Sequence, residues 1–247
     1  MGKDKLRRFR ENKSFANLYE TPFSQVHGKD HPLKGLWGME VFGNNNPITL
    51  ELGCGKGEYT LALARGDRLQ NYIGVDIKGA RLWRGAKTAL EEKLEHVAFI
   101  RTRIELIDSF FAPGEVSAIW ITFPDPQPRK ENKRLTAPRF LERYLKFLRP
   151  GAVIHLKTDN RPLHDYTREI VERRPDFILL QADTDIYRHR KVPDMVLEVK
   201  TFYEEMFLRE GKPITYLQFS TGLPATGSPA GGPAAPEPVA DDDAVPR

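Results

Sequence analysis

The sequence has little cysteine and no long apolar segment. Cys54 is its only cysteine, so no disulfide forms within the chain, which agrees with a reducing cytoplasm. No apolar run is long enough to span a membrane, and the basic N-terminus lacks the apolar stretch of a secretion signal. We therefore expect a cytoplasmic protein with no membrane partner.

Patterns that would bind a metal are also missing. The histidines show no spacing typical of metal ligands, so we expect no metal site and interpret them as structural or surface residues. They are His27, His31, His96, His155, His164 and His189. We interpret Trp37, Trp83 and Trp120 as packing residues, in preference to platforms on which bases stack.

Length and composition suit one soluble domain with flanking segments. Of the 247 residues, 40% are apolar and 29% are charged, which allows a sizeable core. Residues 1–45 are basic and polar, and we expect an arm or cap with little regular structure, ending in a loop over 34–46. Residues 46–220 form the predicted folded domain. Residues 221–247 are rich in Pro, Ala, Gly and acidic residues, and we expect them to be disordered.

Positive charge is concentrated in the predicted folded part. The net charge is +4, and because residues 221–247 carry −3, residues 1–220 carry +7. Eight cations gather in one segment: Arg129, Lys130, Lys133, Arg134, Arg139, Arg143, Lys146 and Arg149. Charge runs are most often solvated helix faces. This one begins four residues after Asp125, which favours a nucleic-acid partner, because clustered cations attract polyanions.

Short apolar segments alternate with amphipathic ones along the middle of the chain. The predicted strands are 48–52, 72–75, 97–100, 118–122, 152–156, 177–180 and 214–219. The predicted helices begin near Gly57 and span 78–94, 138–148, 163–173 and 201–209. This alternation predicts an α/β fold with a doubly wound, mostly parallel sheet of seven strands.

Gly53, Gly55 and Gly57 follow the first predicted strand and open a helix. Glycines in that position let backbone N–H groups approach a ligand. The dinucleotide fingerprint requires a glycine where this chain has Glu58, and the P-loop requires Ser or Thr where it has Gly57. Both phosphate-binding templates therefore fail. A zwitterionic nucleoside without phosphates fits better, and S-adenosylmethionine is the obvious candidate cofactor.

Two carboxylates agree with that cofactor. Asp76 ends the second predicted strand, about 20 residues after the glycine loop, where it can accept hydrogen bonds from ribose hydroxyls. Glu51, just before the first glycine, can compensate the positive amino and sulfonium groups. The alternatives are a helix cap for Asp76 and a strand-end charge facing water for Glu51.

A third carboxylate follows the fourth predicted strand. Asp125 lies between Pro124 and Pro126, and each proline fixes its own φ and favours an extended conformation in the residue before it. Asp125 is therefore held on a stiff loop at a strand end, the edge where α/β sheets bind ligands.

With these motifs the chain resembles the bacterial tRNA (guanine-N7)-methyltransferase family over roughly residues 45–220. The resemblance rests on Glu51-Leu52-Gly53-x-Gly55-x-Gly57, Gly74-Val75-Asp76, Phe123-Pro124-Asp125-Pro126, Lys133-Arg134-Leu135, Thr158-Asp159 and Thr201-Phe202-Tyr203-Glu204. It implies the class I methyltransferase fold, tRNA as partner, and 7-methylguanosine in the variable loop as product.

The resemblance also implies residue roles. Glu51 and Asp76 would hold the cofactor with the glycine loop, and Asp125 would lie at the active centre. Arg129, Asp159, Thr201 and Glu204 would line the guanine side. The chain departs from the family at Gln127, where a tryptophan is usual. It also has Arg101-Thr102-Arg103-Ile104 where a carboxylate or amide usually meets the adenine. Because arginine accepts no hydrogen bond, backbone groups near Arg103 and Ile104 would contact that ring.

The residues suggest how such a transfer would proceed. Guanine N7 has a free lone pair, so the attack needs no general base, and Asp125 would stabilise the cationic guanine that forms. Glu204 and Asp159 could accept hydrogen bonds from guanine and exclude adenine. Two alternatives remain open, namely a methyltransferase acting on another RNA base or on protein, and an inactive RNA-binding module with the same fold. The sequence leaves the oligomeric state open.

Overall fold

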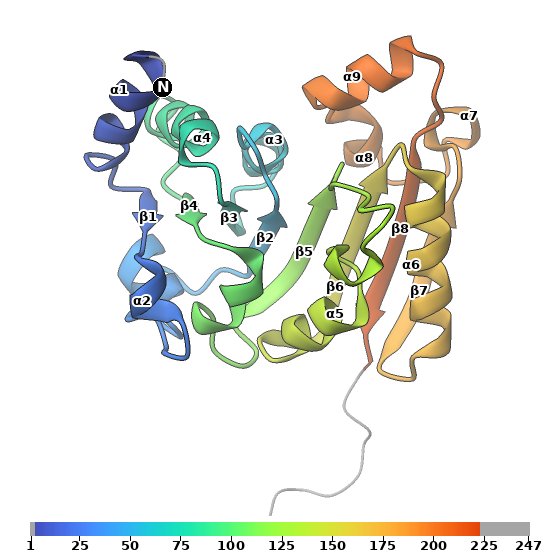
Figure 1. Cartoon of the computed structure of the whole chain (residues 1–247), viewed down its shortest axis with the longest axis horizontal. Helices are drawn as coiled ribbons and strands as arrows, with labels where there is room; N and C mark the ends of the chain where they lie inside the picture. The colour runs from blue at the N-terminus through green and yellow to red at the C-terminus, as the bar shows by residue number, and fades with distance from the viewer. Residues whose placement is uncertain (1–2, 223–247) are drawn as a thin grey trace, which may run out of the picture.

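The computed structural model describes residues 3–222, and these build one mixed sheet with helices on both faces (Figure 1). The strands are β1 Leu18–Glu20, β2 Ile48–Leu52, β3 Asn71–Asp76, β4 Val97–Arg101, β5 Val116–Thr122, β6 Leu148–Thr158, β7 Phe177–Asp183 and β8 Thr215–Thr221. Their order across the sheet is β1-β4-β3-β2-β5-β6-β8-β7. Every pairing from β1 to β6 is parallel, and β8 runs antiparallel to both β6 and β7. This confirms the predicted doubly wound, mostly parallel α/β fold.

Helices cover the two faces of the sheet. They are α1 Lys3–Asn12, α2 Phe23–Val26, α3 Glu58–Gly66, α4 Gly79–Glu91, α5 Pro138–Leu145, α6 Arg161–Arg173, α7 Ile186–His189, α8 Asp194–Glu198 and α9 Phe202–Arg209. Alternate strand residues point to opposite faces, so the sheet supports two apolar cores. One core includes side chains of α5 and α6, and the other includes side chains of α3, α4, α7 and α8.

The N-terminal 45 residues contain more regular structure than the sequence predicted. Besides α1 and α2, they supply β1, an eighth strand that pairs with β4. The expected loop over 34–46 contains a π-helical turn, Trp37–Phe42, and the Trp37 indole N–H donates to the carbonyl of Phe110 at 2.8 Å. Three-residue strands give too short a pattern to detect. The pairing of β1 with β4 is a tertiary contact that the local sequence does not reveal.

The structure also bears on two smaller expectations, the role of the tryptophans and the end of the folded part. Trp37, Trp83 and Trp120 are 0%, 6% and 4% exposed, which confirms that they are packing residues. The folded part ends slightly later than predicted, since β8 includes Thr221 and the Gly222 N–H donates to the carbonyl of Asp176 at 2.9 Å. The rest of the predicted tail lies outside the described residues. No helix within residues 3–222 is long and apolar enough to cross a membrane.

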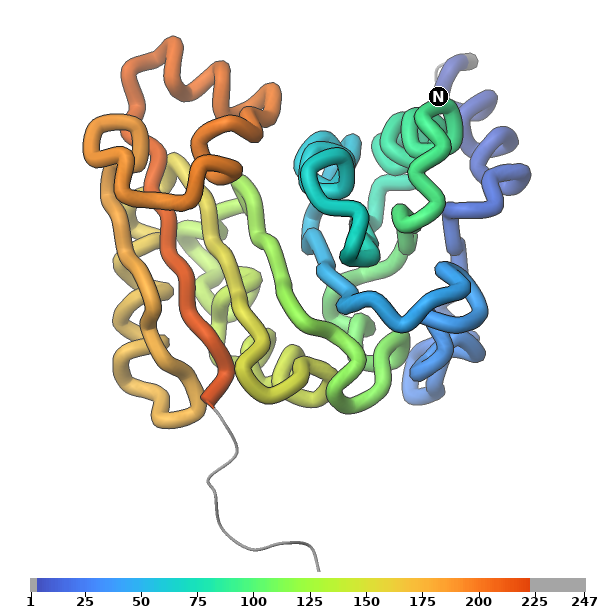
Figure 2. Tube along the Cα trace, turned by 180° about the vertical axis from the view of Figure 1, so that it is seen from behind, coloured from blue at the N-terminus to red at the C-terminus, as the bar shows by residue number. Residues whose placement is uncertain are grey.

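The parallel strands all end at one edge of the sheet, and this edge gathers the predicted site. The carboxyl ends of β2, β3, β4, β5 and β6 point to the same side, and the segment from α7 to α9 lies beyond the ends of β5 and β6 (Figures 1 and 2). Figure 2, which views the sheet from behind, shows this segment and the α3–α4 pair rising at that same edge.

Candidate active site

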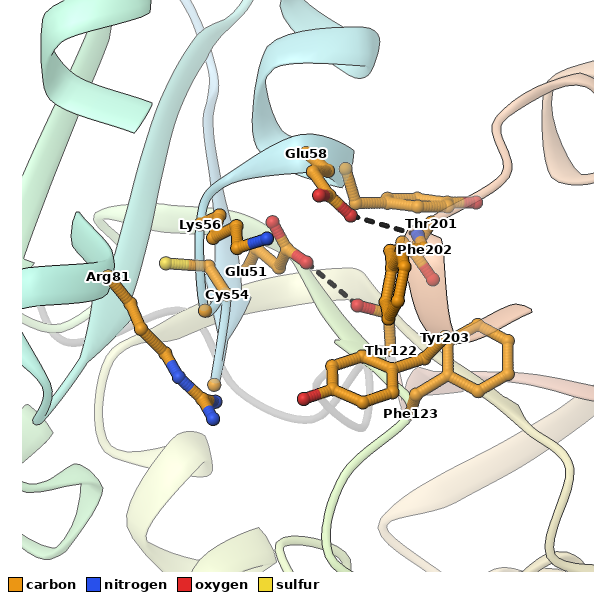
Figure 3. Close-up of a pocket in the computed structure, with 13 residues that line it drawn as sticks. Glu51, Cys54, Lys56, Glu58, Arg81, Thr122, Phe123, Thr201, Phe202 and Tyr203 are labelled. Atoms are coloured by element: carbon orange, nitrogen blue, oxygen red, sulfur yellow. Dashed lines mark hydrogen bonds between the residues drawn. The ribbon is translucent and has the colours of Figure 1, made fainter. Parts of the chain in front are cut away.

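Two adjoining cavities lie at the carboxyl edge of the sheet. The first, here the Glu51 cavity, is lined by the glycine loop, the end of β5 and the start of α9 (Figure 3). The second, here the Asp76 cavity, lies between the ends of β3 and β4 and the Lys133–Leu135 region, and it also includes Arg103 and Ile104. Gly53 lines both cavities. A single elongated ligand could therefore extend from one into the other across the glycine loop.

The three glycines of the loop each have a left-handed backbone conformation. Their φ angles are 81° at Gly53, 59° at Gly55 and 74° at Gly57, which side-chain-bearing residues rarely adopt. At Gly57 a Cβ would lie 2.7 Å from a ring carbon of Phe99, so the helix could not approach the sheet this closely. At Gly55 a Cβ would meet no protein atom within 4 Å. The loop is thus tight against the core on one side and open on the other.

Asp76 holds the glycine loop in place. Its Oδ2 accepts from the Gly55 N–H at 3.0 Å and its Oδ1 accepts from the Lys78 N–H at 2.7 Å, just before α4. Lys78, and not Asp76, is the N-cap residue of α4, and no side chain caps this helix, so the helix-cap alternative is wrong. The hydrogen bonding of Asp76 instead fixes the glycine loop and the turn before α4. It does not exclude a ligand contact, because each carboxylate oxygen has a further lone pair and Asp76 lines its cavity.

We expect Asp76→Ala to weaken cofactor binding by about 1–3 kcal/mol, the scale of hydrogen bonds to a charged group. Calorimetric titration with S-adenosylmethionine measures this change. Asp67→Ala is a suitable control, since Asp67 also accepts a backbone N–H two residues ahead, that of Leu69, and lines neither cavity. Equal affinities of wild type and Asp76→Ala would remove Asp76 from the cofactor site.

Glu51 is buried and hydrogen-bonded at the end of β2. Its side chain accepts from the Thr60 N–H at 2.8 Å, from the Thr60 hydroxyl, and from the Thr122 hydroxyl at 2.7 Å. It is 3% exposed, so the alternative of a strand-end charge facing water is wrong. Burial raises the pKa of Glu51 to about 7, against the lowering effect of these hydrogen bonds. A cationic ligand group in the cavity would favour the ionised form.

This raised pKa predicts a pH dependence of stability. A carboxyl whose pKa rises from 4.5 to about 7 on folding does not lower the free energy of unfolding below pH 4.5. As the pH passes from 4.5 to 7, the carboxyl lowers that free energy by a growing amount. Above pH 7 the loss of stability is complete and amounts to about 3 kcal/mol. We therefore expect Glu51→Gln, without cofactor, to raise the melting temperature more at pH 8 than at pH 5. Thermal unfolding at both pH values tests this, and an equal shift at both would contradict it.

The proline loop after β5 is strained at its start and tied down at its end. Phe123 has a φ of 46°, unusual for a residue with a side chain, and it lines the Glu51 cavity. Asp125 is exposed, and its Oδ1 accepts from the Gln127 N–H at 3.0 Å. Arg134 donates to the carbonyl of Pro126 at 3.0 Å, and its side chain is 7% exposed. Arg134 therefore fixes this loop and is not part of an exposed basic face.

The basic segment 129–149 is divided by the fold. Arg143 and Lys146 both bind Asp108, and Arg139 lies 3.9 Å from Glu105. Arg149 lies at the start of β6, opposite the carboxyl edge. The segment therefore does not form one continuous exposed face of unpaired cations. Arg129, Lys130 and Lys133 are its exposed cations near the site, and Lys133 lines the Asp76 cavity.

The residues predicted for the guanine side are only partly brought together. Thr201 lines the Glu51 cavity and caps α9, where its hydroxyl accepts from the Glu204 N–H at 3.3 Å. Arg129 and Asp159 line neither cavity. Burial raises the pKa of Asp159. Glu204 is fully buried, with its carboxylate 2.7 Å from the ammonium of Lys157 and 2.7 Å from the hydroxyl of Tyr187.

Comparison with known proteins identifies the family. A family model described as "putative methyltransferase" matches residues 45–217. The tRNA (guanine-N(7)-)-methyltransferase of Christiangramia forsetii is 51% identical over 219 residues, which cover 88% of this chain and 97% of that protein. The enzyme of the same name from Bacteroides thetaiotaomicron is 46% identical over 92% of this chain and 88% of its own length. The chain belongs to the tRNA (guanine-N7)-methyltransferase family.

Solved structures agree with this methyltransferase fold. The 16S rRNA methyltransferase KamB matches with a TM-score of 0.58 at 15% identity, over 74% of this chain and 91% of that one. An antibiotic-related methyltransferase matches with a TM-score of 0.56 at 16% identity, over 81% and 99% of the two chains. At these identities the likeness concerns the fold alone, which is of the class I methyltransferase type.

Sequence reasoning missed several residues that line the Glu51 cavity. Arg81, from α4, approaches the Glu51 cavity opposite the exposed aromatic side chains Phe202 and Tyr203 (Figure 3). Glu58 reaches across to accept from the Phe202 N–H at 3.0 Å, so α3 and α9 are joined over this cavity. Glu58 was visible in the sequence as the residue that broke the dinucleotide fingerprint. Nothing local indicated its partner 144 residues away.

Proposed function

We propose that this protein transfers a methyl group from S-adenosylmethionine to N7 of a guanine in tRNA. The observation that carries the proposal is the pair of carboxylates, Glu51 and Asp76, in adjoining cavities that meet at Gly53. Its relatives named above carry the corresponding activity in their names. Nucleoside mass spectrometry of tRNA incubated with the protein and methyl-labelled S-adenosylmethionine tests it. The expected product is labelled 7-methylguanosine.

The arrangement suits the cofactor chemically. Asp76 would accept from the ribose hydroxyls, and backbone groups of Arg103 and Ile104 would face the adenine from the same cavity. Glu51 would face the cationic end in the other cavity, where its burial strengthens the attraction to a positive charge. Gly53, Gly55 and Gly57 leave room along the connecting loop. When bound, S-adenosylmethionine supplies an electrophilic methyl group on a sulfonium.

The protein's own residues would position the base and stabilise its charge. Guanine N7 carries no proton, so we assign no general base. Asp125 lines neither cavity itself but follows two residues after Phe123, which lines the Glu51 cavity, and its carboxylate would stabilise the cationic base. Thr201, which lines the same cavity, would also contact the base, with Arg129 and Asp159 further out. Since Glu204 is buried, we propose that it acts indirectly, by anchoring α9 through its contacts with Lys157 and Tyr187.

Further parts of the proposal concern the rest of the chain. We propose residues 46–222 as the methyltransferase domain, residues 1–45 as an arm docked on it, and a cytoplasmic location with tRNA as partner.

The alternative functions would give different products in the same mass-spectrometric experiment. Label on another nucleoside or on protein would indicate a different methyltransferase. Cofactor and tRNA binding without any transfer would indicate an inactive RNA-binding module.

A further inference from the structure

A basic groove opens from the Glu51 cavity between α3, α4 and the segment that joins α8 to α9. Its lining cations are Arg65 from α3, Arg81 and Arg84 from α4, Lys200 from the joining segment, Lys56 from the glycine loop and Arg8 from α1. Its two acidic lining residues are Glu58 and Glu198. Lys56, Glu58 and Arg81 line both this groove and the Glu51 cavity, so the two spaces are continuous.

Four of the six groove cations are available for an external anion, whereas Arg65 pairs with Glu92 and Arg8 with Asp4. Lys56, Arg81, Arg84 and Lys200 are exposed, and within residues 3–222 no carboxylate oxygen lies within 4.0 Å of their charged nitrogens. Arg81 and Arg84 are three residues apart on α4, so they share one side of that helix. Small side chains lie between the cations, at Ala62, Ala80 and Thr88. This leaves space for a chain carrying regularly spaced negative charge.

We propose that this groove binds the sugar–phosphate backbone of the substrate RNA next to the target nucleotide. The inference rests on the proposed function, because it requires a base in the Glu51 cavity and the adjoining backbone in the continuous groove. Phosphate contacts fix register without reading sequence. A nucleotide that must leave its stack to reach the cavity also needs its neighbours held. The RNA is thus held on the α3–α4 side as well as by the cations after Asp125.

The test compares single substitutions at exposed cations that have no carboxylate within 4.0 Å in the described residues, although the Lys200 ammonium lies 5.2 Å from the centre of the Tyr187 ring. Arg84→Ala and Lys200→Ala change groove residues that line neither the Glu51 nor the Asp76 cavity. Arg149→Ala is the matched control, because Arg149 is exposed, has no carboxylate within 4.0 Å in the described residues, and lies at the opposite edge of the sheet. Fluorescence anisotropy with full-length tRNA at several KCl concentrations gives the affinity and its salt dependence.

We expect each groove variant to bind tRNA several-fold more weakly at low salt. The slope of log affinity against log salt should fall by about 0.7–0.9 for each lost phosphate contact. Arg149→Ala should match wild type, and calorimetry should give all variants the wild-type affinity for S-adenosylmethionine. Wild-type slopes in both groove variants, with 7-methylguanosine formed by the wild-type protein, would overturn the groove and leave the proposed function intact. A different wild-type product would overturn the function instead. Altered sedimentation of the groove variants with unchanged slopes would assign the groove to a protein contact and overturn the RNA proposal.

Discussion

Asp125→Asn should lower kcat by about 100-fold or more while leaving the affinity for tRNA nearly unchanged. The substitution keeps the side-chain oxygen that accepts from the Gln127 N–H, so the proline loop keeps its conformation. It removes the negative charge that would stabilise the cationic guanine. Single-turnover methylation at saturating tRNA and cofactor measures the change directly.

Arg129→Ala provides the contrast. Arg129 is an exposed cation four residues further along, and its loss should raise the apparent KM for tRNA and flatten the salt dependence, with kcat little affected. If Asp125→Asn methylates at the wild-type rate while Arg129→Ala is inactive under saturating conditions, the catalytic centre lies nearer the basic segment than proposed.

Lys157→Met should destabilise the protein by about 3–5 kcal/mol, because it leaves the buried carboxylate of Glu204 without its cationic partner. Lys157 is fully buried at the end of β6, and its ammonium also donates to the carbonyls of Val196 at 2.5 Å and Val199 at 3.0 Å. Burial lowers the pKa of Lys157, and Glu204 opposes that shift. The melting temperature should fall by on the order of 10 °C.

The double variant Lys157→Met with Glu204→Leu distinguishes a lost ion pair from lost packing. Replacing both charges with apolar side chains removes the uncompensated carboxylate, so most of the stability should return. A double variant as unstable as Lys157→Met alone would indicate that the contacts with the α8–α9 segment dominate. Wild-type stability of the single variant would refute the importance of the pair.

The sequence predicted those features that depend on neighbouring residues in the chain, and it did not predict those that depend on contacts between distant residues. Glu51, Asp76 and the glycines were predictable, because each lies at or just after the end of a buried strand and strand ends meet at one edge of a parallel sheet. Arg134 and Glu204 were not. Both belong to motifs that were correctly singled out, but their burial depends on partners that only folding brings near, such as the carbonyl of Pro126 and the ammonium of Lys157.

The basic residues illustrate the same limit for charge. Eight cations in one segment look like a surface, but Asp108 and Glu105, from an earlier segment, pair with three of them. The cations of the groove are scattered from Arg8 to Lys200 and form no run in the sequence. They become one surface only because α3, α4 and the α8–α9 segment converge at the same edge. Likewise, β1 escaped prediction because it owes its existence to pairing with β4.

The position of β8 affects the order in which the sheet forms during synthesis. The last strand within residues 3–222 lies inside the sheet, between β6 and β7, and not at an edge. During synthesis β7 therefore lacks the strand that pairs it to β6 until residues 215–221 leave the ribosome, so this half of the sheet should form last. Nascent chains stalled before Thr215 should show rapid amide exchange in β7 while β2 and β3, already paired, are protected. Slow exchange in β7 of such chains would show that it finds another partner first.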